Sequence, residues 1–167
     1  MKDKKQTNET YSILAKSLHW CFIILFAYGI LKQIEDINQL EDISLLRFEI
    51  LFAAVFLLFL VFRFFYMTKT QKTSLPTETP KFQKMAAKIV HMLMYINLAG
   101  IALSGLLIGY LYWLGYKDGL IINFVIWTHE SFVSIIYWLI SIHVLAAIYH
   151  RLQNDGVWSS MVPFWKE

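Results

Sequence analysis

Four long apolar stretches constrain this chain more than any other feature of its sequence. They run from about residue 12 to 33, 48 to 67, 89 to 113 and 121 to 149, and a helix needs about 20 mostly apolar residues to cross a hydrocarbon core roughly 30 Å thick. The composition agrees, because 57% of the residues are hydrophobic and only 16% are charged, whereas soluble domains usually contain about 25% charged residues. The sequence therefore predicts four transmembrane helices.

Short connections between these stretches predict how the helices are arranged. A cleaved signal peptide is the alternative for the first stretch, but His19 and Trp20 at its start and the acidic KQIEDINQLED after it do not resemble a cleavage site. We therefore predict an all-α, integral membrane, four-helix up-down-up-down bundle that forms a single domain over residues 1–167. After the last span, Gly156 and Pro163 are expected to end helical structure.

The distribution of charge predicts the orientation in the membrane. Basic residues gather before the first span, between the second and third spans and after the fourth, whereas acidic residues gather in the other two connections. Since Lys and Arg concentrate in cytoplasmic loops, both termini are expected to be cytoplasmic. The net charge of +3 reflects this topology, so nucleic acid is not expected as a partner.

Five histidines are the most informative polar residues, because ionisable groups within a membrane are costly and usually functional. His129, His143 and His150 lie in the fourth stretch at intervals of fourteen and seven residues. Fourteen helical residues fall about 40° short of four full turns and rise about 21 Å, and seven return within about 20°. These three side chains should therefore share one stripe, with His143 and His150 in the inner half. His19 and His91 begin the first and third spans, which places them in that half too.

Imidazoles from different helices at a matched depth favour haem as the ligand. The chain has no CxxCH sequence and a single cysteine, Cys21, so attached c-type haem, internal disulfides and thiolate sites are excluded, and Cys21 is expected to be a small core residue. Small residues near these histidines, among them Gly105 and Ala146, would leave room for a porphyrin. Zinc is less favoured, since the inner cluster lacks carboxylate or thiolate partners.

Several short motifs resemble the bacterial cytochrome b561 and hydrogenase-type cytochrome b family over nearly the whole chain. They are SLHW in the first span, VHMLMY in the third, WTHE followed by SIH fourteen residues later, and the YHR exit. The resemblance implies a multi-pass protein of the bacterial inner membrane with b-type haem. It also implies that His19 and His143 are the axial ligands of the inner haem iron. Other residues would contact propionates, quinone or protons: His91, His150, Arg63 and Arg151.

The sequence departs from the family pattern in its second span. A second, outer haem would need a histidine there to pair with His129, but the corresponding position is Glu49. We therefore favour one haem b over two, with His129 as the ligand of any second haem. Glu49 and His129 would otherwise form a hydrogen bond or a proton site.

Three functions follow as hypotheses. The first is a haem b electron carrier of a respiratory chain that transfers electrons between a donor and the quinone pool, whether or not it acts as a quinone oxidoreductase by itself. The second is a haem-bearing anchor subunit that binds a dehydrogenase or hydrogenase. The third is a cofactor-free membrane protein that handles protons or metal ions.

Overall fold

The computed structural model describes residues 10–165, and within this range every regular element is a helix. Four helices are long and apolar enough to span a membrane: α1 (Ile13–Leu31), α2 (Ile43–Thr70), α3 (Lys81–Trp113) and α4 (Leu120–Gln153). A short 3-10 helix, η1 (Ile37–Glu41), follows α1, and a short α5 (Val157–Met161) follows α4. The predicted all-α membrane bundle is confirmed. Four lysines that supported the predicted orientation lie outside the described residues: Lys2, Lys4, Lys5 and Lys166.

Helices α2, α3 and α4 extend beyond their apolar stretches, whereas α1 lies within its stretch, because local signals set the helix ends. Asp42 caps α2 by accepting a hydrogen bond from the Ser44 amide at 2.8 Å, so the helix begins about five residues earlier than predicted. Pro80 precedes α3, which begins about eight residues early. After α3, Gly115 adopts φ +88°, and the Tyr116 amide donates to the Leu111 carbonyl at 2.9 Å. Glycine adopts this left-handed conformation at no steric cost, and the resulting cap turns the chain toward α4.

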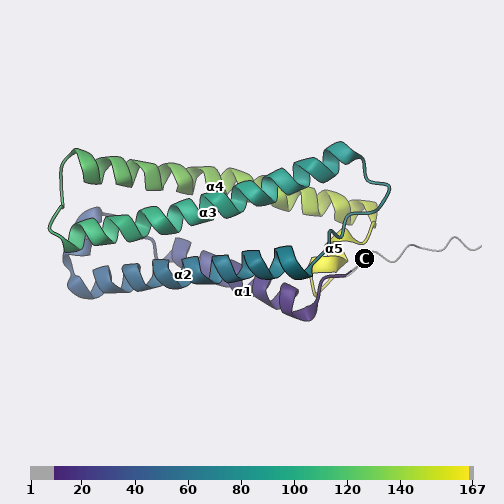
Figure 1. Ribbon diagram of the computed structural model, residues 1–167, viewed down its shortest axis with the longest axis horizontal. Helices are drawn as coiled ribbons and strands as arrows, with labels where there is room; N and C mark the ends of the chain where they lie inside the picture. The colour runs from purple at the N-terminus through teal and green to yellow at the C-terminus, as the bar shows by residue number, and fades with distance from the viewer. Residues whose placement is uncertain (1–9, 166–167) are drawn as a thin grey trace, which may run out of the picture.

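The spans form two pairs that pack into one elongated bundle. Figure 1 shows α1 and α2 along one side and α3 and α4 along the other, and α2 also packs against α3. One end carries the start of α1, the α2–α3 connection, the end of α4 and α5, and we call it the inner end. The opposite, outer end carries η1 and the α3–α4 turn. A backbone-to-side-chain bond of 3.0 Å from Ser12 to Gln71 joins the start of α1 to the inner connection.

Two apolar clusters occupy the bundle. The first, near its middle, brings together all four spans through Phe22, Phe56, Leu98 and Ile136. The second, toward the outer end, joins η1 to the facing parts of α2, α3 and α4 and includes the almost fully buried Ile122. Much of the remaining apolar surface is exposed, as expected for helices whose outer faces contact lipid. Cys21 also lies on an exposed face of α1, so its prediction as a core residue was wrong.

The segment after α4 folds back onto α1. Helix α4 ends at Gln153 with Asn154 in a left-handed conformation, and Gly156 then begins α5 instead of ending a helix. The Trp20 indole Nε1 donates to the Met161 carbonyl at 3.2 Å, and its ring contacts the Phe164 ring at 5.2 Å. Sequence reasoning missed α5, because this helix is too short for a periodic pattern.

Candidate functional site

Imidazoles from three helices gather in the inner half of the bundle, as the sequence predicts. His91 of α3 and His143 of α4 meet edge to face, with ring centroids 5.0 Å apart. Each lies ten residues from the inner end of its helix, which is about 15 Å along the helix axis from that end. His19 of α1 lies close enough to interact electrostatically with both. This inner histidine cluster (His19, His91 and His143) therefore combines residues that are up to 124 positions apart in the sequence.

Arg63 of α2 completes the cluster from the fourth helix. Its Nη2 donates a 2.8 Å hydrogen bond to Nδ1 of His19, and its guanidinium carbon lies 5.5 and 5.4 Å from the ring centroids of Phe22 and Tyr95. Its Nε is buried, with no hydrogen-bond partner among the described residues. Because a buried cation with an unused donor is costly, this position favours an anion beside the histidines.

The remaining inner residues of the predicted site lie closer to the surface. His150 Nδ1 lies 2.5 Å from Asp155 Oδ2, with 17% and 16% of the two side chains exposed. Arg151 is turned toward the tail, where its guanidinium carbon lies 4.8 Å from the Trp158 ring centroid. The structure therefore brings Arg63, but not Arg151, into direct contact with the inner histidine cluster.

His129 lies apart from these residues, toward the outer end, and forms a different interaction. Its Nδ1 is 2.9 Å from the Ser104 hydroxyl, which also donates to the Gly100 carbonyl at 2.6 Å. Ser104 is itself buried. The predicted hydrogen bond between Glu49 and His129 is not formed, because Ser104 on the neighbouring helix takes this position.

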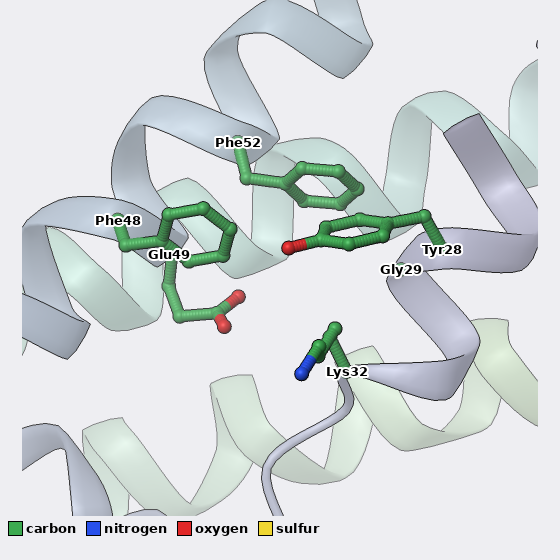
Figure 2. A pocket seen from close by; sticks show the side chains of 6 residues that line it. All are labelled: Tyr28, Gly29, Lys32, Phe48, Glu49 and Phe52. Carbon is green, nitrogen blue, oxygen red and sulfur yellow. The ribbon is translucent and has the colours of Figure 1, made fainter.

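Glu49 instead faces α1. Figure 2 shows its carboxylate directed toward the Lys32 amine and the Tyr28 hydroxyl, with the Phe48 and Phe52 rings beside them. These residues line a small pocket of about 10 Å³ between the two helices. A partly buried carboxylate thus shares its surroundings with a cation, which lowers the cost of its charge near the membrane.

Side chains of neighbouring helices fill the space beside three glycines of α3, toward the outer half. A Cβ added at Gly100 would lie 2.7 Å from the Phe132 ring, and one at Gly109 would lie 2.5 Å from Cγ1 of Ile50. At Gly105 the nearest atom would be Cε1 of His129, at 3.4 Å. Gly105 is therefore at the depth of His129 and does not make room at the inner cluster. These glycines serve close helix packing.

Four apolar spans with imidazoles converging from three of them define a class of membrane bundle able to hold a redox group between its helices. The chain belongs to the prokaryotic cytochrome b561 family, whose model matches residues 10–164. No curated protein and no solved structure matches the chain. Membership implies a multi-pass membrane protein with b-type haem that transfers electrons.

The inner and outer halves differ in how well they fit such a haem. The inner half offers imidazoles from different helices, which suit iron. It also offers Nε of Arg63, which has no partner in the part of the chain that the structure describes and suits a propionate. In the outer half, His129 is the one histidine present, and the space beside α3 is filled by Phe132 and Ile50. The residues present therefore fit an inner haem and do not fit an outer haem with two histidine ligands.

Two partners of the predicted residues were missed by sequence reasoning. Ser104 is a polar residue inside an apolar span, which is a signal that could have indicated a partner for a histidine. Asp155 follows His150 by five residues, just beyond the end of α4, and the pairing depends on the turn at Asn154. The turn brings the carboxylate back toward the helix, and no pattern within α4 predicts it.

Proposed function

We propose that this protein is a haem b electron carrier of the bacterial cell membrane, with one haem in the inner half, that transfers electrons between a donor and the quinone pool. The observation that supports this most strongly is the inner histidine cluster together with the Arg63 donor that finds no partner among the described residues. When bound, b-type haem supplies reversible one-electron transfer at its iron. No second haem is required for this function.

In this proposal His19 and His143 would hold the haem iron. A histidine that binds iron through Nε2 carries its proton on Nδ1, which then donates a hydrogen bond. Arg63 can only donate, so its bond to Nδ1 of His19 has to break when His19 becomes a ligand. The released guanidinium is then free to pair with a propionate, which also satisfies its buried Nε.

Haem content measured by the pyridine haemochrome method on purified protein tests this proposal. We expect about one b haem per chain, lost in His143→Ala and in His19→Ala because each variant removes an axial ligand. His129→Ala should retain the full amount. Haem loss in His91→Ala with retention in His19→Ala would instead make His91 the second ligand. Two haems per chain, or none, would contradict the proposal.

A second candidate is a haem-bearing anchor subunit for a dehydrogenase or hydrogenase. The observation that favours it is a pair of exposed aromatic rings at the inner end, where Phe164 and Trp165 are 46% and 72% exposed. Aromatic residues are enriched in protein interfaces, although they also suit a membrane boundary. A stoichiometric partner that co-purifies with the wild type, and is lost in Phe164→Ser, would support the anchor function.

A further inference from the structure

Helices α1 and α4 carry the two proposed iron ligands, yet they pack little against each other. Helix α1 packs along α2 and α4 packs along α3, whereas no extensive packing joins α1 to α4 within residues 10–165. A metal–ligand distance tolerates a deviation of only about 0.2 Å. A site that α1 and α4 share therefore needs another contact to fix one helix relative to the other.

The segment after α4 connects these two helices at the inner end. Figure 1 shows α5 near both the end of α4 and the start of α1. On the α4 side, Asp155 accepts a hydrogen bond from His150, and the Arg151 guanidinium carbon lies 4.8 Å from the Trp158 ring centroid. Ser160 is 1% exposed, so α5 is packed against the bundle. We call residues 154–164 the tail strap.

Two residues of α1 bind backbone carbonyls of the tail strap. The Lys16 amine donates to the Ser159 carbonyl at 3.4 Å, and Trp20 Nε1 donates to the Met161 carbonyl at 3.2 Å. Lys16 and Trp20 are four residues apart, so they lie on the same face of α1. Both carbonyls belong to the last turn of α5, where carbonyls lack partners within the helix. These bonds therefore satisfy groups that α5 cannot satisfy itself, and they join α4 to α1.

Trp20 links the tail strap to the inner histidine cluster, because it directly follows His19. The two rings meet edge to face, with centroids 6.1 Å apart. Adjacent helical residues point about 100° apart, so holding Trp20 against the strap fixes the rotation of α1 and the direction of His19. A rotation of about 20° would move an atom roughly 5.5 Å from the helix axis by about 2 Å. This displacement is about ten times the tolerance of a metal–ligand distance.

The hydrogen bond from Arg63 does not supply this orientation when iron is bound. It occupies Nδ1 of His19, and because Arg63 only donates, the bond is incompatible with the Nδ1 proton of an iron-binding imidazole. The bond from Trp20 to Met161 uses neither ring nitrogen of His19. It can therefore persist whether or not haem is bound.

We propose that the tail strap fixes α1 relative to α4 and that Trp20 is a positioning residue for His19, an inference that rests on the proposed function. Trp20 acts through His19 and binds neither iron nor porphyrin. The indole N–H is the essential group, since an aromatic ring by itself would also suit the membrane boundary. Removing this N–H should loosen His19 as a ligand and leave the haem content unchanged.

Spin-label distances in the full-length protein as purified test the strap itself. One nitroxide on Cys21, which is exposed on α1, and one on Leu145→Cys, at a position of α4 that is 65% exposed, report the separation of the two helices. Double electron–electron resonance should give a broader distance distribution in Trp20→Phe. The same is expected of Ser160→Trp, which places a large side chain at a buried position. Two controls should match the wild type: Ser160→Ala, and Trp138→Phe on the exposed face of α4.

Carbon monoxide binding to the ferrous haem tests the positioning of His19, because its rate depends on how often a histidine leaves the iron. Binding should be about fivefold faster in Trp20→Phe, as expected for one lost hydrogen bond. In Trp138→Phe it should stay within about twofold of the wild type, since no such bond is removed. The g values of the ferric haem, which depend on the relative orientation of the two imidazole planes, should shift only in Trp20→Phe. In a Ser160→Trp background, Trp20→Phe should add less than about twofold, because both changes break the same link.

The outcomes separate the strap from the proposed function. Unchanged spin-label distances in Trp20→Phe and Ser160→Trp would overturn the strap and leave the tail as an aromatic anchor at the membrane boundary. Wild-type carbon monoxide rates in Trp20→Phe, or full additivity with Ser160→Trp, would overturn the positioning role of Trp20. Absence of haem from the wild type would contradict the proposed function, whereas the spin-label distances would still decide whether the strap joins α1 to α4.

Discussion

The inner and outer halves of the bundle differ in whether their main polar side chains have partners within the bundle. In the outer half, His129 is paired with Ser104, Glu49 shares a pocket with Lys32, and the glycines of α3 are covered by Ile50 and Phe132. In the inner half, three imidazoles and an arginine converge, one donor of Arg63 has no partner within the described residues 10–165, and a groove remains open between α3 and α4. A polar group inside a membrane needs a partner. The outer half supplies surroundings for its histidine and its carboxylate, although the buried Tyr112 hydroxyl has no hydrogen-bond partner within residues 10–165. The inner half leaves members of its histidine and arginine cluster available for a ligand.

Overpacking the outer half should give the largest effect on stability. Gly109→Ala places a Cβ 2.5 Å from Cγ1 of Ile50, so we expect a loss of about 1–3 kcal/mol, which lowers the apparent melting temperature in detergent by several degrees. The matched control Gly105→Ala should cost less, since its nearest atom would be 3.4 Å away. In a double-mutant cycle, Ile50→Ala should recover part of the loss. Equal, additive losses would show that the outer half is not closely packed.

Removing the buried charge of the inner half should alter the haem rather than the fold. Arg63→Gln removes a cation beside the histidines, so the reduction potential should fall by about 60 mV, or roughly 1.4 kcal/mol for one electron. Redox titration of the haem spectrum measures this change. Arg151→Gln is the control, because its guanidinium faces Trp158, and it should shift the potential much less. Equal shifts in both variants would contradict the distinct position of Arg63.

Loss of the hydrogen bond to His129 should lower the free energy of unfolding modestly and leave the haem content unchanged. Ser104→Ala leaves His129 without this partner, and a lost buried hydrogen bond costs about 1–3 kcal/mol when one group stays unsatisfied. Because the His129 imidazole can reorient within the outer half, we expect the loss of stability to be near the lower end of this range. Haem content and potential should equal those of the wild type. A changed haem spectrum in Ser104→Ala would place a haem near His129.

Placing a histidine at position 49 should have the smallest effect of these changes, and the quantity to measure is haem content. Glu49→His returns the residue that a second haem would need, but the position faces α1 (Figure 2) and the space along α3 is filled. We expect haem content to remain at about one per chain, because one imidazole does not open a porphyrin-sized space in a packed core. A doubled haem content would show that the outer half can still open, and that the two halves differ only in this residue.

The sequence by itself determined the four helices, the family and the half of the bundle in which each histidine lies, because hydrophobic length and the 3.6-residue period act locally. It also indicated that the second span lacks a haem ligand, since Glu49 is visible without any structure. Only the tertiary structure decided which groups meet: Arg63 with His19, Ser104 with His129, Asp155 with His150, and Glu49 with the surroundings of Lys32. These pairings depend on helix rotation, crossing and turns between elements distant in sequence. A periodic pattern gives the face of each helix, but not which partner that face will contact.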